Sequence, residues 1–288
     1  MNDGMCASAR NLDLRVRLTL ATGTELTLTG AEVAGFAVEE GADGALLPGS
    51  VLSAALTLDL NNDSGQWRYG GSLRGARPLV GATAEVFVLL EEKALPCGVF
   101  TIESASAREH GGTMRLSGRD SIAAELAGAF QDELTYPATL DQIWRHLVSK
   151  TRYVWSGSLP NGSAVVDAAP DWNGATLRRA AGWIAQAAGC FVRVGRTGAL
   201  EILPCLGGGE EALGPDAYLT LSDGFQSYGP VRGLKVTPVG AEEPFTLSDG
   251  VGETVSIEGN PLFRQGAAHL SALAASTLDQ LKGLTLNR

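Results

Sequence analysis

The chain has 288 residues and a mass of 29.9 kDa, which is enough for two domains or for one large one. Its composition, 44% hydrophobic, 19% charged and 6% aromatic, suits an ordinary globular core and excludes a collagen-like chain, a disulfide-stapled miniprotein and a wholly disordered tail. The net charge of −10 argues against specific nucleic-acid binding, because an acidic surface repels phosphates and the sequence has no dense basic patch.

The cysteines and the apolar runs indicate the compartment in which the protein is made. The cysteines are widely separated and form no Cys-x-x-Cys motif, so we expect reduced, mostly buried thiols: Cys6, Cys97, Cys190 and Cys205. No run reaches the roughly 18 apolar residues of a membrane helix, so we expect no membrane anchor. The first ten residues lack the layout of a secretion signal, which predicts synthesis in the cytoplasm without a signal peptide.

Residues 11–119 alternate between apolar and polar side chains, which is typical of strands with one buried face. Glycine, asparagine and aspartate punctuate the alternating segments and predict turns between them. The expected strands cover residues 12–20, 25–29, 51–60, 84–90, 99–103 and 113–119. This segment is predicted to be a first domain, an antiparallel barrel or sandwich.

Residues 120–206 change to helical periodicity and predict a small α/β insert. Asp120 can cap a short helix over residues 121–126, and Thr139 with Gln142 fits a capping box before residues 140–149. Thr176 can cap a further helix that ends at Gly189. A hairpin over residues 191–194 and 199–203 completes the insert.

Residues 207–288 are predicted to form a second β-rich domain that is incomplete at its C-terminus. A glycine-rich linker covers residues 206–210, and the expected strands cover 218–222, 231–239, 245–248 and 253–258. A helical pattern runs from 261 to 283, and residues 284–288 alternate like the beginning of another strand. The complete fold class is therefore mixed and β-rich, an α+β chain of barrel-like domains with an α/β insert.

The search for catalytic chemistry finds no constellation. Ser50, Ser72 and Ser163 follow glycines but lack the second glycine of a nucleophile elbow, and the sequence has no phosphate-binding loop. His146 lies in a predicted helix without a predicted partner, so we interpret it as a partly exposed structural histidine. We predict no catalytic residues, no cofactor-binding residues, no cofactor and no metal site.

Some weaker signals leave alternatives open. Residues 59–65 place oxygen-bearing side chains as a calcium loop would, although the glycine falls one place late and a polar turn explains the pattern equally well. The adjacent glutamates are expected to be solvated turn residues: Glu39/Glu40, Glu91/Glu92, Glu210/Glu211 and Glu242/Glu243. Five aromatic residues could stack on sugars, whereas Trp144 and Trp183 are expected in the core; the five are Trp67, Tyr69, Trp155, Trp172 and Tyr228.

Several segments, taken in order, resemble the tail-hub proteins of bacteriophages and prophages, the baseplate hub or tail-associated family. Residues 136–140, Tyr-Pro-Ala-Thr-Leu, are the most specific piece, because this step before a Thr-capped helix is similar to Gram-positive prophage hubs. The other matching segments are residues 47–58, the polar turn 61–63, residues 97–103 with their Gly-x-Phe-x-Ile strand, residues 114–120, and residues 176–203. The resemblance covers residues 12–284, and each motif taken alone is weak.

The resemblance implies a structural hub at the tail tip of a phage or phage-like particle. Such hubs are homotrimers whose barrel-like domains, related to tail-tube domains, form a ring that continues the tail tube. Their partners are the tail tube or distal tail protein, the tape-measure protein, and tip or receptor-binding proteins. They are assembled in the host cytoplasm and end in the virion. Family members continue beyond a segment like residues 278–286, which fits the expected incomplete C-terminal domain.

Other functions remain open at this stage. The aromatic residues favour a carbohydrate-binding β module as one alternative. The other alternative is a tail-tip cell-wall hydrolase whose catalytic part lies outside this chain, because these residues offer neither a nucleophile nor an acid pair.

Overall fold

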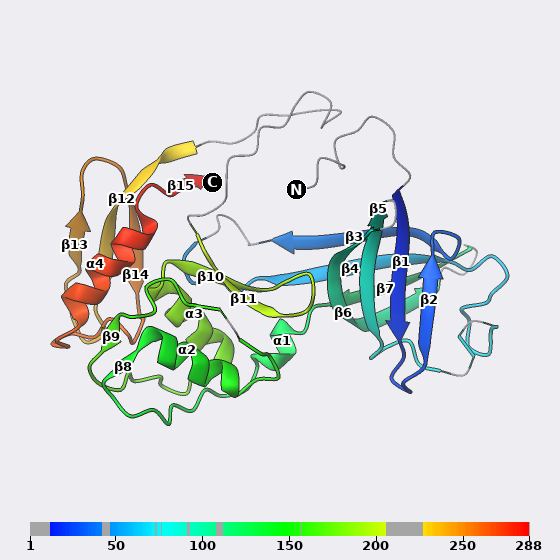
Figure 1. Cartoon of the computed structure of the whole chain (residues 1–288), viewed down its shortest axis with the longest axis horizontal. Coiled ribbons are helices and arrows are strands. Elements are labelled where there is room, and N and C mark those ends of the chain that lie inside the picture. The colour runs from blue at the N-terminus through cyan, green and yellow to red at the C-terminus, as the bar shows by residue number, and fades with distance from the viewer. Residues whose placement is uncertain are drawn as a thin grey trace.

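The computed structural model describes residues 12–41, 47–72, 74–75, 77–90, 93–107, 112–155, 157–205 and 227–287. A bent β-sheet lies at one end of the elongated molecule and a mixed α/β body at the other (Figure 1). We call these the sheet domain and the α/β body. The predicted linker 206–210 and the predicted strand 218–222 lie outside the described residues.

Within the described residues, the sheet domain is a seven-stranded antiparallel sheet in the order β2-β1-β5-β6-β7-β4-β3. This confirms the β-rich, antiparallel prediction. The alternation fixes the register, because Val16 and Leu18 face the core while Arg15 and Arg17 face solvent. The strands are β1 Leu12–Thr19, β2 Glu25–Thr29, β3 Val33–Gly41, β4 Ser53–Asn61, β5 Thr83–Leu90, β6 Lys93–Ala107 and β7 Thr113–Arg119.

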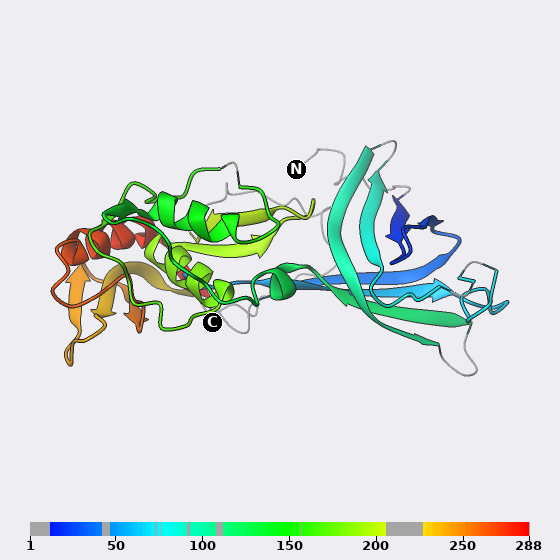
Figure 2. The same cartoon turned by 90° about the horizontal axis from the view of Figure 1, so that it is seen from below.

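The expected barrel is not confirmed, because among the described residues β2 and β3 are left as unpaired edges of an open sheet. The turn between them explains this. The Glu32 carboxylate accepts hydrogen bonds from the Thr29 N–H (2.8 Å) and hydroxyl (2.7 Å), and Asn61 of β4 donates its N–H to the Glu32 carbonyl (2.8 Å). The turn therefore directs β3 onto β4 and away from β2. The sheet bends around its inner face without closing (Figure 2).

The inner face of the sheet is filled by its own apolar side chains and by the segment between β4 and β5. That segment inserts Trp67 and Leu79, which are fully buried among the strand residues. The backbone N–H of Trp67 donates to the side-chain oxygen of Asn62 (2.8 Å), which holds the turn after β4. Trp67 is thus a core residue, and its predicted role as a sugar-stacking aromatic is wrong.

The first part of the α/β body follows the capping signals closely. Thr139 and Gln142 form the predicted capping box, and the Thr176 hydroxyl accepts from the Arg179 N–H. Gly189 has φ 67°, the left-handed conformation expected where a helix ends. The elements are α1 Ile122–Glu125, β8 Ala138–Thr139, α2 Leu140–Ser149, β9 Val165–Val166, α3 Leu177–Ala187, β10 Cys190–Val194 and β11 Leu200–Pro204.

The C-terminal part of the body is a small mixed sheet with one helix packed on it. Its elements are β12 Ser227–Thr237, β13 Phe245–Ser248, β14 Glu253–Glu258, α4 Leu270–Leu281 and β15 Thr285–Asn287, the last paired with β12. The prediction of a helix from residue 261 is wrong, because α4 begins at Leu270. Before it, Phe263 and Gln265 pair their backbones with Val239 beyond the end of β12, so this stretch cannot be helical.

A continuous buried cluster in the α/β body runs from Ile122 to Leu281. It therefore takes side chains from both the predicted insert, 120–206, and the predicted second β-rich domain, 207–288. Buried polar side chains join the parts: Asn260 donates to the Trp183 carbonyl (2.9 Å) and Thr277 donates to the Ala187 carbonyl (2.7 Å).

Candidate functional site

The sheet domain and the α/β body are joined by the segment before β4. Gly49 donates its N–H to the Cys190 carbonyl (2.7 Å), and Val192 exchanges hydrogen bonds with Ser50 and Leu52 (2.8 Å each). Residues 49–52 thereby form a short parallel strand against β10, centred on Val51 and Val192. These backbone bonds fix the position of the segment, so the surface beside it is preformed.

Asp120 forms a second tie between the sheet domain and the α/β body. Its carboxylate accepts hydrogen bonds from the Ser53 hydroxyl (2.8 Å), the Ala54 N–H (2.6 Å) and the Ile122 N–H (3.3 Å). The sequence predicted Asp120 as the cap of the short helix, and it does accept from the first turn, although the residue at the N-cap position of α1 is Ser121. Asp120 thus links the beginning of β4 to the end of β7 and the start of α1.

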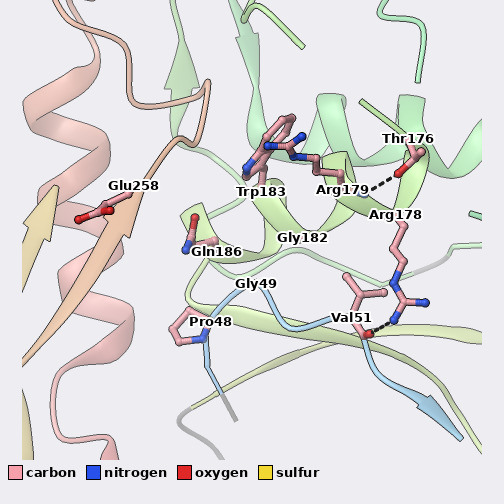
Figure 3. Close-up of a pocket in the computed structure, with 10 residues that line it drawn as sticks. All are labelled: Pro48, Gly49, Val51, Thr176, Arg178, Arg179, Gly182, Trp183, Gln186 and Glu258. Carbon is pink, nitrogen blue, oxygen red and sulfur yellow. Dashed lines mark hydrogen bonds between the residues drawn. The ribbon is translucent and has the colours of Figure 1, made fainter. Parts of the chain in front are cut away.

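A groove with a volume of about 500 Å³ opens along this junction (Figure 3). We call it the junction groove; it is lined by Pro48, Gly49, Val51, Thr176, Arg178, Arg179, Gly182, Trp183, Gln186 and Glu258. Where the two walls of the groove come closest, each wall has a glycine, because a Cβ on either would clash with the backbone opposite. A Cβ on Gly49, which has φ +90°, would lie 2.8 Å from the Gly182 carbonyl oxygen, and a Cβ on Gly182 would lie 2.9 Å from the Gly49 oxygen.

The charges in the junction groove are asymmetric. Arg178 donates to the Val51 carbonyl (2.7 Å), and the Arg179 guanidinium lies over the Trp183 ring, 4.7 Å from its centroid. Within the described residues, neither arginine forms an ion pair. Figure 3 shows Glu258 on β14, across the groove from Thr176 and Arg178.

The α3 N-terminus offers no free amides to a ligand at this groove. The Leu177 and Arg178 N–H groups donate to the carbonyls of Gly128 (2.7 Å) and Leu126 (2.9 Å), and the Arg179 N–H donates to Thr176. A ligand in this groove would therefore be bound by side chains. The distinctive feature of the groove is the Arg179 guanidinium stacked on the Trp183 indole.

The structure does not bring the sequence-level candidates into one site. His146 is partly buried and its Nε2 lies 3.1 Å from the Gln131 carbonyl and 3.3 Å from the Glu133 nitrogen, so it joins α2 to the preceding loop as a structural histidine. Ser50 takes part in the junction strand, while Ser72 and Ser163 lie elsewhere and the three do not converge. Cys6 and His110 lie outside the described residues, as do Glu91, Glu92, Glu210 and Glu211.

The segment with calcium-like spacing is occupied by protein contacts. Asp59 forms a bidentate ion pair with Arg115 (2.7 and 2.8 Å), and the Asn62 oxygen is taken by the backbone N–H of Trp67. Among the residues that the structure describes, no three His, Cys, Asp or Glu side chains converge as metal ligands. The polar-turn interpretation of residues 59–65 accounts for these contacts.

The remaining aromatic residues divide differently from the prediction. Trp172 is buried and donates its indole N–H to Asp132 (2.8 Å), while Trp155 packs edge-on against the buried Trp144. Trp183, expected in the core, is instead half-buried in the junction groove. Of the five sugar-stacking candidates, Tyr69 is 73% exposed, and the Arg74 guanidinium lies over its ring. The side chain of Tyr228 is not among those that the structure describes.

Burial keeps two of the cysteines in the thiol form. It raises the pKa of Cys190 and of Cys205 to about 12, so neither forms the reactive thiolate at neutral pH. Cys97 is half-buried and is also a free thiol.

Apart from Thr176, predicted as a helix cap, and Trp183, expected in the core, the residues that build the junction groove were not singled out by the sequence. Two signals were present: an adjacent pair of arginines at the start of a helix, and Gly182 inside it, where glycine costs about 1 kcal/mol relative to alanine. A glycine in a helix interior indicates a close backbone approach, but not the segment that approaches.

Comparison with known proteins finds solved structures of similar fold. No family model matches the sequence, and no curated protein matches it. The structure is similar to the prophage tail protein gp18 from Listeria monocytogenes EGD-e, with 13% identity, a TM-score of 0.52, and coverage of 89% of this chain and 76% of that one. The 43 kDa tail protein of prophage MuSo2 from Shewanella oneidensis covers 91% of this chain and 76% of its own at 12% identity and a TM-score of 0.49.

A tail protein from Neisseria meningitidis MC58 has a TM-score of 0.48 at 14% identity, with coverage of 91% of this chain and 74% of that chain. The likeness to gp18 shows the fold: this chain shares its fold with that prophage tail protein. The likeness covers the sheet domain and the α/β body together. In the described part of the chain, no helix has the length and apolar character needed to cross a membrane.

Proposed function

We propose that this chain is a structural protein of the tail of a bacteriophage or a phage-like particle. The observation that carries the proposal is the fold shared with the Listeria prophage protein gp18 over 89% of the chain. A likeness limited to the sheet domain would fit any β-rich module. A likeness that also extends through the junction and the α/β body favours a role as a tail protein.

Within the tail, the proposed position is the hub at the tip, where three copies form a ring that joins the tail tube to tip or receptor-binding proteins. Within the described residues, β2 and β3 have no strand on their outer sides, which supports this position, since an exposed sheet edge is a template for pairing with another chain. Head-to-tail contacts between identical subunits form a ring when the rotation from one subunit to the next closes on itself. The distal tail protein and the tape-measure protein are the proposed neighbours along the tube.

The acidic character of the chain supports the same role. With a net charge of −10, the protein disfavours adhesion of nucleic acid, which suits a tube through which DNA must pass. We propose a non-enzymatic role for these residues, since the chemistry-bearing side chains described above are engaged in structural contacts. A clear zone in peptidoglycan zymography with this chain would contradict the non-enzymatic proposal and favour a tail-tip hydrolase.

A carbohydrate-binding module is less well supported than the tail role. Of its candidate stacking residues, Trp67 and Trp172 belong to the core, and Trp155 packs against a core tryptophan. Glycan-array binding by a monodisperse monomer would favour the module over the hub.

The tail proposal is tested by the mass of the purified chain in solution and by the location of the chain in the particle. Light scattering on the purified chain should give three times its 29.9 kDa. An antibody against the chain should label one end of the particle tail in immunogold micrographs. Labelling along the whole tail or on the head would contradict the hub position, and particles without any label would contradict the tail role.

A further inference from the structure

We propose that the junction groove binds the β12–β13 loop, residues 238–244, of a second copy of this chain, with Arg178 and Arg179 receiving Glu242 and Glu243. The inference rests on the proposed function in one respect, since an assembly of several copies supplies the second chain. It adds a specific contact that neither the fold likeness nor the hub role specifies.

The arginine pair has no acidic partner of its own. Within the described residues, eight other arginines and lysines form ion pairs, whereas Arg178 contacts a backbone carbonyl and Arg179 contacts the Trp183 ring. Other described arginines, such as Arg15 and Arg68, also have no ion pair, but Arg178 and Arg179 are adjacent and both line the junction groove. Their positive charges favour an acidic occupant of the junction groove, because complementary charges across an interface favour the correct partner.

The β12–β13 loop carries the matching charges. Glu242 and Glu243 are both exposed and neither forms an ion pair in the described part of the chain. The adjacent glutamates on β3 differ, because Glu40 is held by Arg193 (3.2 Å). Of the adjacent glutamate pairs that the structure describes, Glu242/Glu243 is therefore the one in which neither member has an ion pair.

The shape of the loop suits an open groove. The loop is held at its base, where Val239 donates to the Phe263 carbonyl (2.7 Å) and Ala241 donates to the Pro238 carbonyl (3.0 Å). Such preorganisation lowers the entropy cost of binding. Val239 is 36% exposed and Pro244 is exposed, which provides apolar surface for the half-buried Trp183 beside the glutamates.

The proposed occupant is the loop of another copy. In this structure none of residues 238–244 lines the junction groove. The loop begins directly after Thr237, which pairs with Glu258 of β14 at the edge of the groove, and it runs from there to β13, on the side of β12 away from β14. A contact between two different surfaces of identical chains is heterologous and can continue around a ring.

The test uses a full-length receptor whose own loop is disabled, Glu242→Arg with Glu243→Arg, so that the junction groove is intact and empty. The probe is a fluorescein-labelled peptide of residues 237–246, Thr-Pro-Val-Gly-Ala-Glu-Glu-Pro-Phe-Thr, and the reference probe carries glutamine at both glutamate positions. Fluorescence anisotropy at low salt should show about tenfold tighter binding of the glutamate peptide, and the difference should shrink as salt rises.

Adding Arg179→Glu to the receptor should remove this difference between the two peptides. Arg179 is exposed and forms no side-chain hydrogen bond in the described chain, so the variant should keep the wild-type melting temperature. The matched control is Arg68→Glu, at an arginine of the sheet domain that is also exposed, which should leave the preference unchanged.

Equal binding of both peptides, absence of binding, or an unchanged preference in the Arg179→Glu receptor would each overturn the proposal. These outcomes are separate from failure of the hub role. The peptide measurement needs no ring, whereas the hub role is decided by the mass and tail position of the wild-type chain.

Discussion

Replacing Asp120 tests whether the sheet domain and the α/β body depend on one buried carboxylate. The Asp120 side chain belongs to a residue that is 6% exposed, and its oxygens accept from Ser53, Ala54 and Ile122. Asp120→Ala removes these bonds together and leaves the Ala54 N–H without its partner. Asp120 bonds both the start of β4 and the start of α1, so removing its side chain should loosen both segments.

The expected magnitude follows from the hydrogen bonds lost. A hydrogen bond to a charged group contributes about 1.5 to 3 kcal/mol, and the Ile122 contact at 3.3 Å is the weakest. Asp120→Ala should therefore lower the free energy of unfolding by about 3 to 5 kcal/mol. Ser53→Ala removes one of the bonds from a carboxylate that keeps the others, so it should cost about 1.5 kcal/mol, the low end of that range.

The assay is urea denaturation of the wild type and both variants, followed by tryptophan fluorescence, with amide hydrogen exchange at Ala54 as a local readout. Asp120→Ala should shift the midpoint further than Ser53→Ala and should speed exchange at Ala54. Asp120→Asn keeps the shape and one acceptor, so it should fall between the two. An Asp120→Ala effect no larger than that of Ser53→Ala would refute the reasoning.

Other predictions concern the core, the groove and acid stability. Leu56, 1% exposed, should not tolerate aspartate, because an unpaired buried carboxylate costs several kcal/mol, whereas Thr57→Asp should express solubly; equal yields would contradict the register. Gly49→Ala should lower the melting temperature, because its Cβ would lie 2.8 Å from a carbonyl oxygen of α3 at φ +90°, and an unchanged melting curve would contradict that contact. Burial alone would raise the pKa of Asp167, but hydrogen bonding led by the Ala268 N–H outweighs it and holds this pKa below its usual value. Its stabilisation should therefore be present above about pH 4, the region of an ordinary carboxyl pKa, and disappear as pH falls through the lowered pKa. Asp167→Asn should shift the urea midpoint at about pH 6 and progressively less as the pH falls through that lowered pKa, and a shift that does not depend on pH would contradict this.

Much of the fold follows from local signals. The period-two pattern places β1, β4 and β7, since each has one face that must be buried, and the Thr139–Gln142 pair fixes the start of α2 within one residue. Such features depend on neighbours three residues away or fewer. They are therefore visible in a single sequence.

The missed features depend on distant partners. The open edge between β2 and β3 results from Asn61 of β4 pairing with the turn at Glu32. The late start of α4 results from the pairing of Phe263 and Gln265 with Val239. Trp67 alternates with polar residues like a surface aromatic, and only the insertion of its loop under the sheet buries it.

The junction groove shows the same limit. Gly182 indicated that some backbone approaches α3, but Gly49 lies 133 positions earlier in the sequence, and nothing local pairs the two. Arg179 and Trp183 are four residues apart on a helix, a spacing that places them on one face. That contact was accessible from the sequence, although its place in a groove was not.

Negative-stain imaging of the purified full-length chain, with two-dimensional averaging, tests the central proposal most directly. The hub account predicts threefold rings with a central hole, built from subunits that each show a sheet domain joined to an α/β body. Compact monomers that stay single at high protein concentration and also in the presence of the tail-tube protein would contradict it.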